Sequence, residues 1–194
     1  MRKSYQGARR ARLMLAANLL AAFTASAVHA ESAKPPPELD AVRGALAKYA
    51  DPVVAVRDGY FSTLGCVYYR EGGMGIHFIN PALIGPQLDP MKPQLLLYEP
   101  EGGKLRLVGA EWFIPLATGV KERPALFGHP FDGPMEGHEP LMPKDLQHYD
   151  LHVWLFKDNP AGTFAVVNPT VRCDGYDYAF PEEPPMQVAH PGAH

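Results

Sequence analysis

Five histidines lie between positions 77 and 152 of this 194-residue chain, and acidic residues share the same interval. The side chains of interest are His77, His129, His138, His148, His152, Glu99, Glu111 and Asp150. Neutral imidazoles and carboxylates are ligands that bind Zn, Cu, Fe or Mn in proteins. The chain contains no HExxH, CxxC, GxSxG, Walker or Rossmann pattern. The composition therefore indicates a metal site without indicating a reaction.

One expected strand, 148–157, carries two of these histidines on the same face, because successive residues of a strand point to opposite sides. Its apolar face is formed by Tyr149, Leu151, Val153 and Leu155. The other face carries His148, Asp150, His152, Trp154 and Phe156. His148 and His152 are separated by roughly 13 Å on a regular strand, too far to share one metal ion. We favour a solvent-exposed position for His148, whereas His152 beside Trp154 suits the wall of a pocket.

Two further expected strands place an acid and a histidine in comparable positions. In the strand 104–115, Glu111 is the acid on a face that it shares with Leu105, Leu107 and Phe113. In the strand 74–79, His77 lies on the face opposite to Met74, Ile76 and Phe78. A metal site can therefore be assembled across strands.

We predict that His77, Glu111 and His152 bind one transition metal ion: Zn, Cu, Fe or Mn. Three protein ligands leave an open position for water or a substrate. His138 or His129 would close the site from a loop. We assign His138 as the fourth ligand or a proton-transfer group, which makes it the candidate catalytic residue.

Each of these assignments has an alternative that involves no metal. His77 can be a core histidine that is bonded to a backbone carbonyl. Glu111 can form a buried ion pair with Arg106 or Arg172. The two histidines of the loop at 116–147 can be exposed to solvent.

The first 30 residues have the features of a secretory signal peptide. Five basic residues lie between Arg2 and Arg12, a largely apolar stretch runs from 13 to 28, and small residues precede a cleavage site after Ala30. The apolar stretch is short for a membrane span, although an uncleaved anchor is the alternative. The pair at Arg9 and Arg10 also raises the twin-arginine export route. We expect a periplasmic or secreted protein.

Removal of the signal peptide makes the mature chain acidic. The segment 1–30 carries five of the 18 Lys and Arg residues and none of the 21 Asp and Glu residues, so the mature chain has a formal charge of −8. An acidic exported domain is a poor partner for nucleic acid or an anionic lipid surface. We expect neither nucleic-acid binding nor stable membrane insertion after cleavage. The oligomeric state is not indicated.

The chain contains two cysteines, Cys66 and Cys173. In an oxidising compartment an isolated pair is most simply a disulfide bond. The alternative is a reactive or metal-binding pair of thiolates, for which the CxxC spacing is missing.

The order of expected elements predicts a single α+β domain at 38–177. An N-terminal helical segment at 38–60, which Pro52 can divide and Gly59 can end, should pack on a curved antiparallel sheet or small β-barrel of about six strands. Its apolar residues recur every three or four positions, so one stripe should face the body of the domain: Leu39, Val42, Leu46, Tyr49, Val53 and Val56. The expected strands are 66–70, 74–79, 94–99, 104–115, 148–157 and 163–167. The long stretch 116–147 is interpreted as an ordered loop across the mouth of the sheet. Residues 31–37 are expected to be a tether and 178–194 a flexible tail.

Several longer segments resemble a family of uncharacterised exported bacterial proteins. They include GGMGIHFINP at 72–81, LFGHPFDGPMEGH at 126–138 and HYDLHVW at 148–154. The likeness continues through 159–162, 168–169 and Cys173, so it covers most of the mature domain. The resemblance implies no activity and no catalytic or metal-binding residue.

The leading functional prediction is an exported metal-dependent enzyme that acts on a small molecule beneath the Pro- and Gly-rich loop, with an oxidoreductase favoured over a hydrolase. The first alternative is a non-catalytic module that holds a small apolar or aromatic ligand between Trp112, Trp154 and Tyr98. The second is a structural cell-envelope protein with incidental histidines. Metal content distinguishes the first prediction from the other two.

Overall fold

The structure is a computed structural model that describes residues 36–189. The predicted signal peptide at 1–30, most of the predicted tether, and the tail histidines His190 and His194 lie outside the described residues. Within residues 36–189, no helix is both long enough and apolar enough to cross a membrane.

The described chain begins with the expected helical segment. It consists of helix α1 at Glu38–Leu46, a 3-10 turn at Ala47–Ala50 and helix α2 at Pro52–Arg57. Pro52 starts the second helix, and Asp51 caps it by accepting a hydrogen bond from the backbone N–H of Val53 at 2.9 Å. The break changes the direction of the apolar stripe. Val53 and Val56, which were expected to face the body, are 71% and 51% exposed.

The remaining regular structure is almost entirely β. The strands are β1 Phe61–Tyr69, β2 Gly72–Ile79, β3 Leu95–Glu101, β4 Lys104–Pro115, β5 Ala125–Leu126, β6 His129–Pro130, β7 Asp132–Met135, β8 His148–Val153 and β9 Ala179–Pro181. Two 3-10 turns lie at Pro81–Leu83 and Leu116–Thr118.

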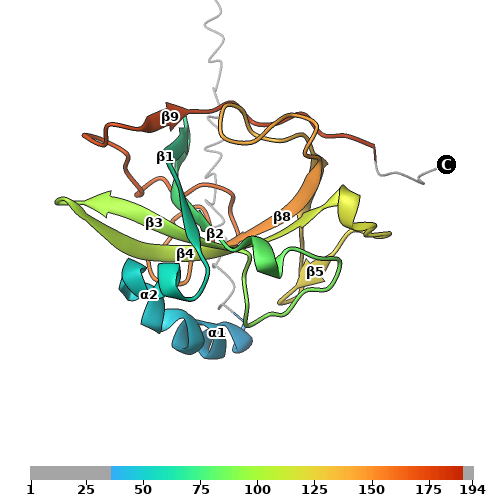
Figure 1. The fold of residues 1–194 in the computed structure, drawn as a ribbon, viewed down its shortest axis with the longest axis horizontal. Coiled ribbons are helices and arrows are strands. Elements are labelled where there is room, and N and C mark those ends of the chain that lie inside the picture. The colour runs from blue at the N-terminus through green and yellow to red at the C-terminus, as the bar shows by residue number, and fades with distance from the viewer. Residues whose placement is uncertain (1–35, 190–194) are drawn as a thin grey trace, which may run out of the picture. The chain divides into compact units, whose positions relative to one another are not determined.

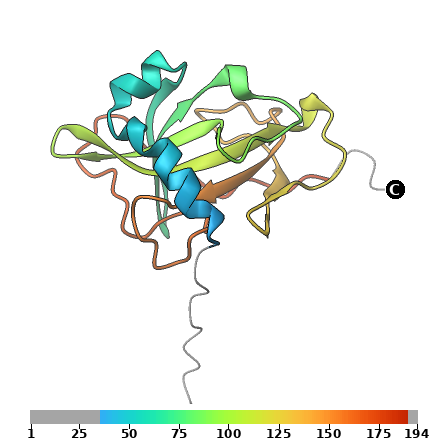
Figure 2. The ribbon, with the colours of Figure 1, turned by 90° about the horizontal axis from the view of Figure 1, so that it is seen from below.

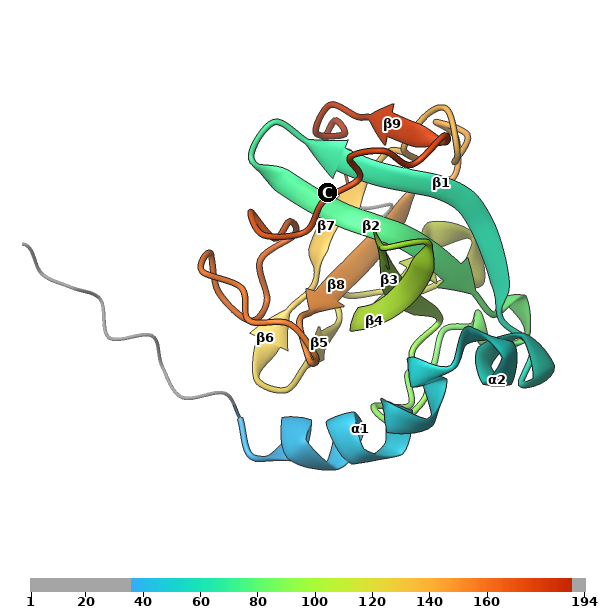
Figure 3. The same ribbon diagram turned by 90° about the vertical axis from the view of Figure 1, so that its left-hand side faces the viewer.

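Seven of these strands form one curved sheet in the order β7-β8-β4-β3-β2-β1-β9, and β5 and β6 form a small separate hairpin. All neighbours in the large sheet are antiparallel except β1 and β9. Figures 1 and 3 show the sheet curling so that β1 and β8 stand on opposite sides of the space above β3 and β4. The prediction of an α+β fold with a helical segment on a curved sheet is confirmed.

The main core lies between the helices and the outer face of the sheet (Figure 2). Leu39, Val42 and Leu46 of α1 are at most 2% exposed. They belong to one cluster with the predicted apolar face of the last long strand, Tyr149, Leu151, Val153 and Leu155. Burying that face directs the other face of β8 toward the inside of the curl.

A β-bulge in β4 reverses the predicted grouping of its side chains. Leu97 pairs with Gly109 but Tyr98 pairs with Leu107, so β4 has one extra residue, Val108. Such an extra residue shifts the alternation by one. Leu107 therefore joins the main core, whereas Glu111 lies on the inner face. The expectation that these two residues share a face was wrong.

A second bulge occurs in β2, three residues before His77. Val67 pairs with Gly75 and Tyr68 with Gly73, which leaves Met74 as the extra residue. Gly75 has a φ of +89°, and a Cβ atom there would collide with the carbonyl oxygen of Tyr98, so only glycine fits. Met74 consequently lies on the same face as His77, contrary to the expectation from simple alternation.

The segments expected to be irregular are more ordered than predicted, and one expected strand is absent. The stretch 116–147 contains β5, β6 and β7, and β7 pairs with β8. Residues 163–167 form no strand. The expected end of the globular domain at 177 is too early, because β9 pairs with β1 and Gln187 bridges to Met135. Residues 178–189 are therefore part of the fold.

The predicted disulfide between Cys66 and Cys173 is present, with the two Cα atoms 5.7 Å apart. It joins β1 to the segment that leads into β9. The backbone N–H of Cys66 also donates a hydrogen bond to the carbonyl oxygen of Tyr178 at 2.8 Å. These two links hold the C-terminal segment along the edge of the sheet.

Candidate metal centre

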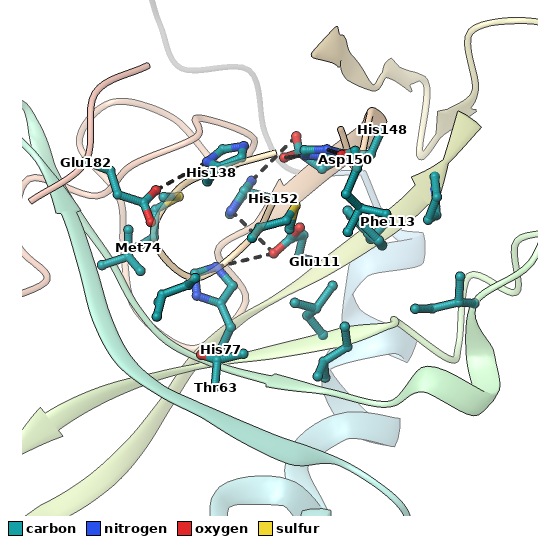
Figure 4. A pocket seen from close by; sticks show the side chains of 18 of the residues that line it. Thr63, Met74, His77, Glu111, Phe113, His138, His148, Asp150, His152 and Glu182 are labelled. Carbon is teal, nitrogen blue, oxygen red and sulfur yellow. Dashed lines mark hydrogen bonds and ion pairs between the residues drawn. The ribbon is translucent and has the colours of Figure 1, made fainter. Parts of the chain in front are cut away.

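A pocket of about 300 Å³ lies on the inner face of the curled sheet (Figure 4). Its wall is mostly apolar and includes Val67, Ile79, Leu95, Phe113, Leu141 and Leu146. The last two belong to the long stretch 116–147, so part of this stretch lines the pocket. Imidazoles, carboxylates and the hydroxyl group of Thr63 form the polar part of the lining.

The three predicted metal ligands come together in this pocket. Glu111 of β4 pairs directly with His152 of β8, and Glu111 Oε2 lies 3.6 Å from His152 Nε2. His77 reaches the same oxygen from β2, with its Nε2 atom at 3.3 Å. One ligand atom from each residue lies within 4.8 Å of the other two. Because β3 separates β2 from β4, the curvature of the sheet is what brings His77 to this position.

A second group of possible ligands lies beside the first and was not predicted as a group. His138 from the loop meets His148 and Asp150 from β8, and again one atom from each lies within 4.8 Å of the others. His148 Nε2 is 3.6 Å from Asp150 Oδ2. The expectation that His148 faces solvent was wrong, because it is only 1% exposed. In the sequence, the alternation of β8 places His148, Asp150 and His152 on one face. This pattern is the signal that could have identified the second group.

Two residues that sequence reasoning missed support His138. Its Nδ1 atom lies 3.3 Å from Glu182 Oε2 and 3.1 Å from the hydroxyl oxygen of Tyr69. The Glu182 side chain is only 3% exposed, although it was assigned to a flexible tail. No pattern in the sequence marks Glu182, because it is brought to the pocket by the parallel pairing of β9 with β1.

Other candidate residues lie away from the pocket. His129 stacks on Phe164 with the ring centres 4.5 Å apart. Glu99 pairs with Lys157 at 2.6 Å, and Arg106 pairs with Glu101 rather than with Glu111.

The aromatic residues proposed to hold a ligand do not form a binding site. Tyr98 and Trp112 are fully buried in the main core, and Trp154 belongs to a separate small cluster. Each donates a hydrogen bond to a backbone carbonyl: Tyr98 to Tyr49, Trp112 to Asp89, and Trp154 to Ala165. The prediction that a ligand binds between these three aromatic residues is therefore wrong.

The electrostatics of the pocket favour positive charge. Burial lowers the pKa of His77, but its contact with Glu111 and the nearby carboxylates raise that pKa above its usual value. Burial also opposes protonation of His148, and Asp150 is the main group that raises its pKa. Burial raises the pKa of Asp150, but the two histidines of β8 hold it below its usual value. Each shift follows from a carboxylate facing an imidazole inside the protein.

Six buried side-chain atoms in the described part of the chain lack a hydrogen-bond partner, and all six belong to residues that line this pocket. They are Thr63 Oγ1, Glu111 Oε2, His138 Nε2, Asp150 Oδ1, His152 Nδ1 and His152 Nε2. Buried polar atoms without partners are rare and costly. Nitrogen and carboxylate oxygen atoms that converge in this way match the donor set of a transition metal ion.

Chemically, the arrangement offers imidazole nitrogen and carboxylate oxygen donors at the inner end of an apolar cavity. Comparison with protein-family models, with curated proteins and with solved structures found no match. The functional conclusion therefore depends on the geometry of the pocket.

Proposed function

We propose that the mature protein is an exported metal-dependent enzyme. His77, Glu111 and His152 bind a transition metal ion, Zn, Cu, Fe or Mn. The observation that carries the proposal is the convergence of buried, unpartnered nitrogen and oxygen atoms in one pocket. A bound cation supplies the missing partner to these atoms and can activate a substrate or water as a Lewis acid or redox centre.

The charge balance supports a cation at this position. Three carboxylates, those of Glu111, Asp150 and Glu182, face the pocket and are each at most 9% exposed. The lining residues include no lysine or arginine. Buried carboxylates without a fixed positive partner are strongly unfavourable, so a metal ion or protonated histidines must compensate for them.

The substrate of the proposed enzyme is a small and largely apolar molecule. The cavity has the size of a small-molecule site, and its apolar walls include Phe113 and the loop residues Leu141 and Leu146. Oxidation or reduction is favoured over hydrolysis. Apart from the seven imidazole or carboxylate side chains and Thr63, the wall offers no side-chain group to orient an attacking water or stabilise an oxyanion.

His138 completes the site from the loop, as a ligand or as a proton-transfer group. When Nδ1–H donates to Glu182, the lone pair of Nε2 points into the pocket, where that atom has no partner. A carboxylate that faces the far nitrogen of an imidazole fixes its tautomer and raises its basicity. His138 is thereby prepared to accept a proton or to bind a cation.

Metal content of purified protein without a His tag tests the proposal. The ion held by these three residues should be lost in each of the variants His77→Ala, Glu111→Ala and His152→Ala. Circular dichroism should show that each variant remains folded. His129→Ala is the matched control, because His129 is a histidine of the same domain that stacks on Phe164 outside the pocket. If wild type stays metal-free after loading with Zn, Cu, Mn and Fe(II), the proposal is wrong.

A non-catalytic binding protein is the second candidate, and the apolar cavity of about 300 Å³ is the observation that favours it. In that case the ligand lies in this cavity rather than among the three core aromatics. A metal-free protein that retains a small apolar molecule through purification, without converting it, would support this candidate.

A further inference from the structure

We propose that the pocket holds two metal ions, and that the imidazole of His152 bridges them. The first ion is the one proposed above, so the inference rests on the proposed function. The second ion is bound by His138, His148 and Asp150. Figure 4 shows the two groups side by side, with the His152 ring between Glu111 and Asp150.

The second group has the geometry of an independent site. Its three ligand atoms come from the loop and from β8, within 4.8 Å of one another. His148 and Asp150 are 1% and 2% exposed, and the side chain of His138 is 11% exposed. None of these residues belongs to the first group.

Hydrogen bonds outside the group direct both histidines toward a cation. His148 Nδ1 lies 3.0 Å from the carbonyl oxygen of Leu146, which can only accept, so Nδ1 carries the proton. In the neutral ring the lone pair of Nε2 then faces Asp150 Oδ2 at 3.6 Å. Two electron-rich atoms face each other there, and a cation between them removes the repulsion. Outer partners of this kind are typical of histidines that bind metals.

His152 has the position of a bridging ligand. Its Nε2 atom lies 3.6 Å from Glu111 Oε2 in the first group, and its Nδ1 atom lies 3.9 Å from Asp150 Oδ1 in the second. Both nitrogens are buried and neither has a hydrogen-bond partner. A neutral imidazole has one N–H and one lone pair. Binding an ion at each nitrogen therefore requires the loss of the N–H proton, which passes to the buffer.

Two divalent ions balance the charge of the bridged arrangement. The carboxylates of Glu111, Asp150 and Glu182 and the bridging imidazolate carry four negative charges together. Within the described residues these carboxylates have ion-pair contacts only with histidines. Two divalent cations neutralise the group, whereas with one ion protonated histidines would have to balance the remaining negative charge.

Copper stoichiometry tests the second site. Wild-type protein loaded with Cu²⁺ and passed through a desalting column should retain about two equivalents. His148→Gln and the isosteric Asp150→Asn should each retain about one, as should His77→Gln, which removes the other ion. The control His129→Gln should retain the wild-type amount. Two variants at the second site keep the test informative if one of them fails to fold.

The possible results separate this inference from the proposed function. One equivalent in wild type that persists in His148→Gln and Asp150→Asn but is lost in His77→Gln overturns the second site and leaves the proposed function standing. No retained copper, zinc, manganese or iron overturns both.

The bridge has a spectroscopic test. Two Cu²⁺ ions joined by an imidazolate are magnetically coupled, so the electron paramagnetic resonance signal of the fully loaded wild type should integrate to far less than its copper content. The signals of His77→Gln and Asp150→Asn, each with one ion, should account for all of their copper. A fully loaded wild type whose signal equals its copper content would show that His152 does not bridge.

Discussion

At the scale of single residues, the pocket histidines face carboxylates at contact distance. His77 Nε2 lies 3.3 Å from Glu111, and His148 Nε2 lies 3.6 Å from Asp150. The pKa values of both histidines are raised above their usual value of 6.5. In the metal-free protein a proton on each ring therefore partly replaces a metal ion.

We expect metal-free protein to lose stability as the pH rises above about 6.5. A histidine whose pKa is raised by folding stabilises the protein fully below its unfolded pKa, and this contribution is lost as the pH rises through its folded pKa. The lowered pKa of Asp150 makes the stability depend on pH in the acidic range. Its contribution is present above the usual value of 3.8 and is lost as the pH falls through its folded pKa.

Urea unfolding of chelator-treated protein between about pH 4 and pH 9 measures this dependence. His148→Gln should reduce the loss of stability above about pH 6.5, because one of the two histidines with a raised pKa has been removed. Metal-loaded protein should keep its stability there, since cations take the place of the protons. A metal-free wild type with constant stability above about pH 6.5 would count against the raised histidine pKa values.

Glu182 should act through His138, as a residue that positions it. Glu182→Gln keeps the shape of the side chain but removes the charge that faces Nδ1 at 3.3 Å. Affinity at the second ion site should fall by about 10- to 100-fold, while the site at His77 keeps its affinity. Competition with a chelator measures both.

The adjacent exposed residue gives the control, Glu183→Gln, which should leave both affinities unchanged. Equal losses in the two variants would mean that general charge, rather than the contact with His138, is responsible.

At the scale of elements, the disulfide and β9 position Glu182. Cys66 and Cys173 are separated by 107 residues. Replacing both with serine should lower the free energy of unfolding by about 4–5 kcal/mol in the chain-entropy model. Denaturant unfolding of the oxidised wild type and of the double variant checks this value.

The same variant should also bind the second ion more weakly than the first, because the segment that carries Glu182 is no longer tied to β1. A double variant with unchanged stability would show that hydrogen bonding along β9 is sufficient.

The sequence predicts which strands and helices form the site better than it predicts which side of each strand a residue faces. Alternation in β8 correctly separated the core residues, such as Leu151, from the polar residues, such as His152. The apolar spacing of α1 correctly predicted its buried stripe. Both signals are local, because they depend on the period of a single element.

The rest of the site depends on irregular or long-range features that carry no local period. The bulge at Val108 moves Glu111 to the opposite face from Leu107, and one inserted residue is enough to do so. Glu182 reaches the pocket only through a parallel pairing of segments that lie more than a hundred residues apart in the chain. His148 was misjudged because the loop that covers it was not assigned to any element.

At the scale of the whole molecule, the disulfide is typical of proteins from oxidising compartments. We therefore keep the proposal that the protein is exported, and we predict cleavage after Ala30. Mass spectrometry of protein recovered from the periplasm or the medium should show a mature chain that starts at Glu31. A recovered chain that retains residues 13–28 would indicate a membrane anchor instead.

The central claim is that a transition metal ion is bound between β2, β4 and β8. The most direct measurement is anomalous diffraction from crystals of metal-loaded protein, recorded above and below the absorption edge of the loaded metal. We predict an anomalous peak within bonding distance of His77, Glu111 and His152. A loaded protein whose anomalous peaks lie only outside this pocket, or that shows none, would contradict the claim.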